Sequence, residues 1–370
     1  MIDNYSSYIK RHKYQLDFIK RKEEIQIGNI QDLPLEIDQL LNTTENSSFV
    51  EETFNSGLTA YIYKIKGKDR YWTLKKRREN ILVKNVDGQT SFLNEVQRRY
   101  DFDKLKKDSQ KASFFKVIVD TIYASLNKGI ILSPWIEGQH IRTYNEPVLE
   151  SIFDTIYHLD IEGFFEWDLC AGNILEKDNK IVLYDFGYMY RFNPLIEFNS
   201  EGRTMPIFHG AERFETRSYF QYLMDIETDF SMTKVLRELR MEKELALKYY
   251  IKKLKWLENN KADRDIIDWI RNIISQWEKA LSSTTDLEAL YVIESFRSYV
   301  LDLLDDVGGK SCQPHTIIKA EKILYSLKHN FSLLKEKKSF FFGDEKMTQE
   351  QLIEQYSHKK ILAEKWQIRT

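Results

Sequence analysis

A short stretch in the middle of the chain combines the residue types that phosphoryl transfer needs. Asp168 and Asn173 stand five residues apart, and the triplet Asp185-Phe186-Gly187 follows shortly afterwards. In this reaction the protein does little covalent chemistry. A carboxylate must orient the attacking hydroxyl, and oxygen ligands must hold the Mg²⁺ that bridges the phosphates. Asp168 suits the first task, and Asn173 and Asp185 suit the second if a short hairpin brings them to one end.

These two motifs resemble the protein-kinase-like superfamily, whose catalytic loop reads D-x-x-x-x-N and whose metal-binding turn reads D-F-G. The resemblance covers roughly residues 50–221. It implies an enzyme that transfers the γ-phosphoryl group of ATP to an acceptor hydroxyl, with Mg²⁺ or, alternatively, Mn²⁺. It also implies that Asp168 is catalytic and that Asn173 and Asp185 bind the metal. The alternative is an unrelated protein in which these residues form turns and end a strand.

A lysine and a glutamate upstream extend the resemblance. Lys75 ends the run Tyr-Trp-Thr-Leu-Lys, where the family carries V-A-I-K, and it would bind the α- and β-phosphates. Glu95 lies on an expected helix and would pair with Lys75. Each has a simpler interpretation. Lys75 could belong to a solvated basic strand end, with Lys76 on the other face as second candidate, and Glu95 could form an exposed pair with Arg99.

The resemblance also places nucleotide contacts in two further segments. Besides Lys75, the residues expected to contact the nucleotide are Ser56, Gly57, Thr59, Ser133, Trp135 and Ile136. The first three occupy the position of the family's glycine-rich loop, although a single glycine fits an ordinary turn equally well. The last three fall where the family's hinge meets the adenine, and Trp135 could instead be a core residue.

The sequence departs from protein kinases on both sides of these motifs. Glu166 and Trp167 precede Asp168, so the loop lacks the arginine that receives an activation-loop phosphate in regulated protein kinases. No A-P-E segment follows the D-F-G triplet. Instead, a charge-rich stretch carries Arg213 and Arg217, four residues apart. These arginines could contact a carboxylate or phosphate on the acceptor, or they could form internal ion pairs.

These departures resemble kinases for small molecules or glycans, such as aminoglycoside, choline and lipopolysaccharide-core kinases. We therefore expect a hydroxyl on a small molecule or glycan as the acceptor. Three alternatives stay open: an atypical Ser/Thr protein kinase, a nucleotide-binding pseudokinase that acts as an interaction module, and an enzyme that transfers AMP.

Hydrophobic periodicity predicts the elements that must position these residues. Strands are expected at 58–65, 71–75, 114–124, 130–132, 173–175 and 181–186. Helices are expected at 91–100, 148–159, 266–277, 287–300 and 316–334. Turn residues at 67–69 and 127–129 would close the first two strand pairs, and Thr285 with Glu288 would form a capping box.

This order predicts an α+β chain with a bilobal protein-kinase-like fold, in which a small antiparallel β-sheet lobe precedes a large, mainly helical lobe. Residues 1–45 are expected to form a helical extension that packs on the small lobe. The small nucleotide-binding lobe would span 46–137, the large catalytic lobe 138–335 and a C-terminal tail 336–370.

Composition favours a globular, cytoplasmic protein. The 370 residues are 42% hydrophobic, enough to bury a core, and 55 basic against 57 acidic residues give a net charge of −2. Such a balance provides no field that would attract nucleic acid or an anionic membrane. Cys170 and Cys312 stand far apart, which argues against a disulfide framework or a cysteine zinc site. We expect neither a signal peptide nor a transmembrane segment.

Overall fold

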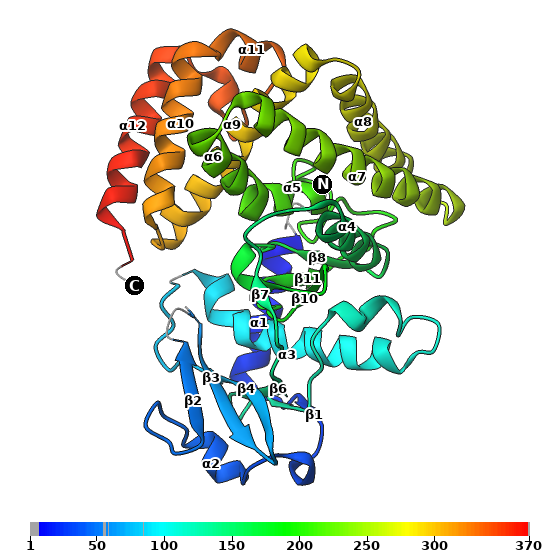
Figure 1. The fold of residues 1–370 in the computed structure, drawn as a ribbon, viewed down its shortest axis with the longest axis vertical. Helices are drawn as coiled ribbons and strands as arrows, with labels where there is room; N and C mark the ends of the chain where they lie inside the picture. Colours follow the sequence, from blue (N-terminus) through cyan, green and yellow to red (C-terminus); the bar gives the residue numbers. More distant parts are fainter. Residues whose placement is uncertain (1–6, 55–56, 58, 84, 369–370) are drawn as a thin grey trace. The chain divides into compact units, whose positions relative to one another are not determined.

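The structure is a computed structural model that describes residues 7–54, 57, 59–83 and 85–368 (Figure 1). The chain divides into two compact units. The first, here called the sheet unit, comprises residues 1–141, 158–193 and 197–205. The second, here called the helical unit, comprises residues 142–157, 194–196 and 206–370. The expected α+β class is confirmed, with a small antiparallel sheet and a mainly helical C-terminal part.

A six-stranded antiparallel sheet with the order β1-β5-β6-β4-β3-β2 forms the framework of the sheet unit. Its strands are β1 (Gln26–Ile27), β2 (Val50–Phe54), β3 (Ala60–Gly67), β4 (Arg70–Arg77), β5 (Tyr123–Ser125) and β6 (Ile130–Pro134). Lys68 and Asp69 adopt positive φ angles of 49° and 57° in the β3–β4 turn. Gly129 has φ 68° in the β5–β6 turn, so both predicted turns are confirmed.

The expected strand over 114–124 is wrong for most of its length. Phe114–Val117 forms the 3-10 helix η2, and only Tyr123–Ser125 belongs to the sheet. The reason is tertiary. Phe115 is buried with its ring centroid 5.7 Å from that of Phe102, a residue of the neighbouring helix. A tight helical turn brings Phe115 to this aromatic partner.

Helices cover both faces of the sheet, because successive strand residues point to opposite sides. On one face, Leu74 and Leu132 pack with Leu40 of α2 (Ile37–Leu41). On the other face, Ile131 packs with Val96 of α3 (Val86–Lys107) and with Phe18 of α1 (Ser7–Lys20). The short 3-10 helix η1 (Ile30–Asp32) lies between β1 and α2 in the chain. Helix α3 is thereby fixed against the central strands (Figure 1).

Two small sheets complete the sheet unit. One has the order β10-β9-β7, and the other pairs β11 with β8. Their strands are β7 (Gln139–His140), β8 (Phe164–Glu166), β9 (Ile174–Lys177), β10 (Lys180–Leu183) and β11 (Met189–Arg191). The predicted β9–β10 hairpin is confirmed. Asp178 and Asn179 form its turn with positive φ angles of 53° and 58°.

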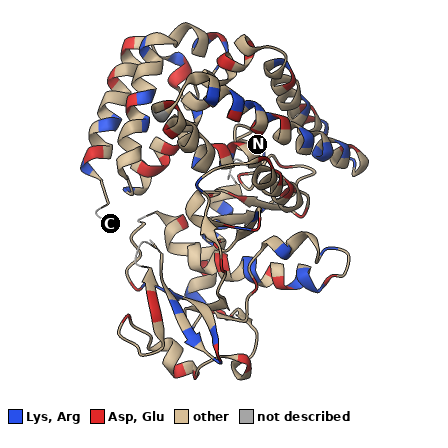
Figure 2. Ribbon diagram, viewed as in Figure 1, with Lys and Arg blue, Asp and Glu red and all other residues tan. Residues whose placement is uncertain are grey.

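The helical unit contains most of α4 (Glu146–Ile161) and all the helices that follow β11. These are α5 (Gly210–Phe214), the π-helical turn Glu215–Tyr219, α6 (Phe220–Asp229), α7 (Met232–Asn259), α8 (Arg264–Leu281), α9 (Thr284–Gly309), α10 (Pro314–His329), α11 (Phe331–Glu336), the 3-10 turn Asp344–Lys346 and α12 (Gln349–Lys365). Acidic and basic residues both occur along these helices (Figure 2). None of the described helices is long and apolar enough to cross a membrane.

Two expectations about these helices need correction. The N-cap of α9 is Ser283, whose side chain accepts a hydrogen bond from the backbone N–H of Asp286, so the capping box proposed at Thr285 is wrong. The helix expected over 316–334 is two helices, because the chain leaves helical geometry at Asn330.

A buried charge cluster lies within the helical unit. Lys243 of α7 has no exposed surface, and its Nζ lies 2.7 Å from Glu215, 2.6 Å from Glu294 and 3.4 Å from Glu242. Burial raises the pKa of Glu242 to about 7, although Lys243 acts in the opposite direction. One ammonium group faces three carboxyl groups, so burial favours the protonated form of Glu242.

Candidate active site

Lys75 lies on a central strand and points toward α3. It pairs across the sheet with Ile62 on β3 and Ile131 on β6. Its ammonium group donates a hydrogen bond to Glu95 and another, 2.8 Å long, to Oδ2 of Asp185. The adjacent Lys76 points to the other face, where its Nζ donates to the carbonyl of Thr43 at 3.1 Å. The structure therefore places Lys75, and not Lys76, with the other candidate residues.

Glu95 is buried, with 1% of its surface exposed, so the interpretation as a surface carboxylate is wrong. Its second oxygen accepts a 3.0 Å hydrogen bond from Nε of Arg99, which is itself 4% exposed. Arg99 also donates to Oγ of Ser133 at 2.9 Å and to the carbonyl of Tyr184 at 2.8 Å. Arg99 thus joins α3, β6 and the residue before Asp185 in one buried network.

The ammonium group of Lys75 is stabilised by the carboxylates of Asp185 and Glu95. Burial opposes the charge on Lys75, but Asp185 and Glu95 outweigh it and raise the lysine pKa above its ordinary value. Burial likewise opposes the charge on Asp185, but Lys75 outweighs it and lowers the pKa of that carboxyl. Lys75 and Asp185 are consequently both ionised at neutral pH. A buried ammonium group beside the partly exposed carboxylate of Asp185 suits a ligand that carries both a polyphosphate and a divalent cation.

The β9–β10 hairpin brings the remaining candidates to one end. Ile174 pairs with Leu183, so Asn173 precedes the first strand where the second strand leads to Asp185. The side-chain amide of Asn173 donates to both the carbonyl and Oδ2 of Asp168, each at 3.0 Å. This contact fixes the Asp168 carboxylate relative to the hairpin.

The oxygen atoms at the hairpin fit a divalent cation. Because the Asn173 amide nitrogen faces Asp168, its carbonyl oxygen faces away from Asp168. Oδ1 of Asp185 accepts a 3.1 Å hydrogen bond from the backbone N–H of Gly187, which fixes the carboxylate plane. Mg²⁺ commonly binds one or two protein oxygen ligands and completes its shell with water and phosphate. Within the described residues, no group of three or more His, Cys, Asp or Glu side chains is arranged to hold a metal.

Asn94 is a site residue that the sequence interpretation missed. Its side-chain amide nitrogen lies 3.1 Å from the carbonyl of Phe186, 3.0 Å from that of Gly187 and 2.6 Å from that of Met189. A single α3 side chain therefore holds the backbone of the turn that follows Asp185. The only signal in the sequence was an asparagine directly before Glu95, and the structure shows that Asn94 is 1% exposed.

The loop before β3 is described only in part, because Ser56 lies outside the described residues. The carbonyl of Gly57 accepts a 2.8 Å hydrogen bond from Nε of Arg78, and that of Thr59 accepts a 3.0 Å bond from the Arg78 backbone N–H. A Cβ atom on Gly57 would lie 2.5 Å from the carbonyl oxygen of Ala60, so this position requires glycine. Neither contact tests the expected role in nucleotide binding.

The expected hinge residues lie at the end of β6. Trp135 is half-buried and stacks on Phe54, with the ring centroids 5.9 Å apart. Nζ of Lys64 lies 4.4 Å from the centroid of the same ring. Ile136 is also half-buried. Ser133 directs its hydroxyl inward to Arg99, so only its backbone is left to contact a nucleotide.

We predict that Ser133→Ala lowers the free energy of unfolding by about 1–2 kcal/mol, because the Arg99 guanidinium loses one buried acceptor. The variant should leave ATP affinity within about twofold of the parent, since Arg99 keeps its contact with Glu95. Urea denaturation and ATP titration would check the two quantities. A large loss of ATP affinity at unchanged stability would instead assign the hydroxyl to the nucleotide.

Arg213 and Arg217 belong to the helical unit, where both have carboxylate partners. NH2 of Arg213 lies 3.4 Å from Asp305. Arg217 pairs with Asp302 and lies 3.9 Å from Asp306. Burial alone would raise the pKa of Asp302, but Arg217 and Lys319 lower it. These contacts match the alternative of internal ion pairs, and no observation points to an acceptor.

No protein-family model matches this sequence, and a search of curated proteins gives no match either. The interpretation of the site therefore depends on the geometry of its own residues.

Proposed function

We propose that the protein is an ATP-dependent phosphotransferase with a bilobal protein-kinase-like fold, which moves the γ-phosphoryl group of Mg-ATP to an acceptor hydroxyl. The observation that carries the proposal is the group of Lys75, Glu95 and Asp185, in which the first two residues are buried and Asp185 is partly exposed. These residues come from β4, α3 and the segment after β10, and they are the residue types that the reaction requires.

Each residue has a defined task in this proposal. Lys75 binds the phosphates of ATP, and Glu95 holds Lys75 in place. Asn173 and Asp185 would hold Mg²⁺, which neutralises charge on the phosphates. Asp168 accepts a hydrogen bond from the acceptor hydroxyl and takes up its proton. The acceptor oxygen then bonds to the γ-phosphorus as the bond between that phosphorus and the bridging oxygen breaks, which releases ADP.

The residues before Asp168 support control without an activation-loop phosphate. Oε1 of Glu166 accepts a 2.8 Å hydrogen bond from the backbone N–H of Asp168. Glu166 therefore supports the loop from the position of the histidine in the family's H-R-D motif, and Trp167 takes the position of the arginine. An indole carries no positive charge with which to bind a phosphate group. This supports kinases of small molecules or glycans as the nearest functional class and makes such a hydroxyl the proposed acceptor.

The test incubates the purified protein with γ-labelled ATP, Mg²⁺ and a cell extract, and separates protein, glycan or lipid, and small-molecule fractions. Lys75→Met is the control. We expect Lys75-dependent label in glycan or small molecules. Label in protein would favour the atypical protein kinase, label only from α-labelled ATP would favour AMP transfer, and no Lys75-dependent label with retained ATP binding would favour the pseudokinase.

A further inference from the structure

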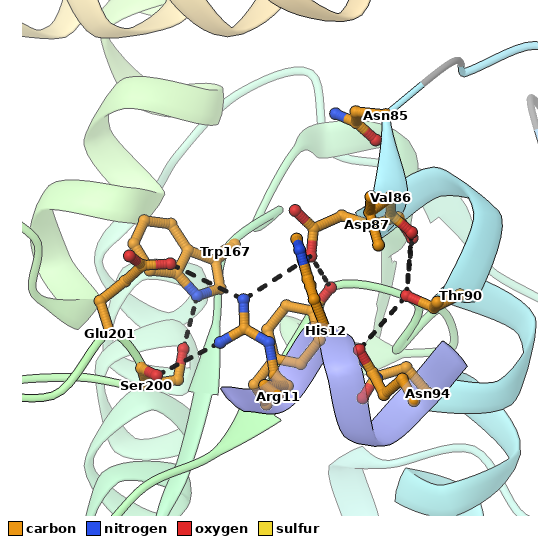
Figure 3. Close-up of polar contacts among 12 residues, drawn as sticks. Arg11, His12, Asn85, Val86, Asp87, Thr90, Asn94, Trp167, Ser200 and Glu201 are labelled. Atoms are coloured by element: carbon orange, nitrogen blue, oxygen red, sulfur yellow. Dashed lines mark hydrogen bonds and ion pairs between the residues drawn. The ribbon is translucent and has the colours of Figure 1, made fainter. Parts of the chain in front are cut away.

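The N-terminal helix α1 contacts α3 through a polar cluster centred on Asp87 (Figure 3). Asp87 lies in the first turn of α3, eight residues before Glu95 on the same helix. Oδ1 of Asp87 lies 2.9 Å from Nε2 of His12 and 3.6 Å from NH2 of Arg11. Two side chains of α1 thus hold the beginning of the helix that presents Glu95.

The same acidic residue also holds the segment that follows Asp185. The hydroxyl of Tyr190 donates a 2.7 Å hydrogen bond to Oδ1 of Asp87. The guanidinium of Arg11 lies over the Tyr190 ring, 3.8 Å from its centroid. Asn94, two turns along α3, binds the carbonyls of the same segment. The turn after Asp185 is therefore attached to α3 at two points, and α1 takes part in one of them.

Arg11 extends these contacts to the segment that precedes Asp168. Its NH1 donates to the backbone carbonyl of Ser200 at 3.2 Å, and its NH2 lies 3.7 Å from Glu201. The hydroxyl of Ser200 accepts a 2.8 Å hydrogen bond from the indole of Trp167, which directly precedes Asp168. Figure 3 shows Arg11 lying between Asp87 on one side and Ser200 and Glu201 on the other.

Apolar packing between α1 and α3 depends on Phe18, which belongs to one buried cluster with Phe92, Leu93 and Val96. Phe18 is the one apolar residue of α1 that is buried, alongside His12 and Gln15. A cavity of about 760 Å³ opens here, and residues of both helices line it, among them Arg11, Phe18, Asn94 and Arg98. Phe18 therefore fixes the C-terminal half of α1, and the polar contacts of Arg11 and His12 fix its N-terminal half beside this cavity.

We propose that α1 is a built-in positioning element for the active site, and that Arg11, His12 and Asp87 act as its positioning residues. These three residues fix the positions of the segments that carry Glu95, Asp168 and Asp185 relative to one another, without a contribution from another molecule. This inference rests on the proposed function. It assigns to an N-terminal helix the task for which the sequence lacks a phosphate-receiving arginine.

The test compares Arg11→Met and Asp87→Ala with two matched controls in the full-length protein. Lys13→Met changes an exposed cation on the same helix. Asp103→Ala removes an exposed pair with Lys107 on α3. The readouts are kcat and KM for ATP-dependent transfer, amide hydrogen exchange of residues 185–191, and the thermal midpoint.

For Arg11→Met and Asp87→Ala we expect a fall in kcat/KM of about tenfold to 100-fold, since small displacements of reacting groups have effects of this size. Exchange in 185–191 should become about tenfold faster, whereas both controls should stay within about twofold. In a Glu95→Gln background, Asp87→Ala should have little further effect on ATP affinity. In the proposal, both changes act through the contact between Lys75 and Glu95. His12→Gln, which keeps a donor, should retain more activity than His12→Ala.

Two failures are distinguishable. If the parent protein neither binds ATP nor transfers phosphate, the proposed function is wrong, and the exchange measurement still tests the coupling. If the parent is active but Asp87→Ala matches Asp103→Ala in kcat/KM and in exchange, the positioning role is wrong. If the fall in kcat/KM is in proportion to the fall in the thermal midpoint for every variant, controls included, then α1 has a purely structural role. That result would overturn the inference as well.

Discussion

Changing Asp168 to asparagine should lower the kcat for ATP-dependent transfer by about 10³-fold and leave ATP affinity within about threefold. Asparagine keeps the shape of the side chain but cannot take up the proton of the acceptor hydroxyl. Lys75, Glu95 and Asp185, which the proposal assigns to the nucleotide, keep their contacts. Steady-state kinetics together with direct ATP titration would separate the two quantities.

The matched control is Asp178→Asn, which makes the same chemical change in the exposed β9–β10 turn. Its kcat should be close to that of the wild type, since asparagine tolerates a positive φ angle.

Asp185→Asn should behave differently from Asp168→Asn, because it removes the charge that pairs with Lys75. Its main loss should appear in the affinity for Mg-ATP. Wild-type kcat in Asp168→Asn would refute the assigned role.

The second large effect concerns stability in the helical unit. Glu242→Gln should stabilise the protein at pH 8.5 by about 3 kcal/mol and have little effect near pH 4.5. The folded-state pKa of Glu242, about 7, exceeds the ordinary value of 4.5. The stability linked to its proton is therefore complete below about pH 4.5 and is lost as the pH rises through about 7. Glutamine stays neutral throughout and avoids this loss.

Urea titrations of both proteins at several pH values, followed by circular dichroism, would measure the difference. Amide exchange in α7 would assign it to the helical unit. Glu244→Gln is the control, because Glu244 lies two residues away on an exposed position of the same helix. Equal pH dependence in Glu242→Gln and in the parent would show that Glu242 is ionised in the folded protein across this range.

The sequence predicted those parts of the site that depend on local pattern. The β3–β4 hairpin follows from its turn residues, and the two-residue period along β4 separates Lys75 from Lys76. The spacing of Asp168, Asn173 and Asp185 around a short hairpin was likewise readable from the chain. Each of these features needs only neighbouring residues for its explanation.

The parts that were missed depend on contacts between distant residues. His12 and Asp87 are 75 residues apart, and Asn94 and Met189 are 95 apart, so neither pair leaves a periodic signal. The strand predicted over 114–124 was wrong for the same reason, since Phe115 packs on Phe102 and does not continue a strand. Tertiary packing overrides local propensity in such cases. Glu95 was also open to a surface interpretation because its helix carries many polar residues.

The long sequence separation of the α1 contacts has a consequence for biosynthesis. Arg11 and the carbonyl of Ser200 are 189 residues apart, and β1 pairs with β5, about 98 residues later. On the ribosome, α1 emerges before any of these partners exists, and Arg11 can bind the carbonyl of Ser200 only after residue 200 has been made. A nascent chain therefore cannot complete the contacts of α1 before that point of synthesis.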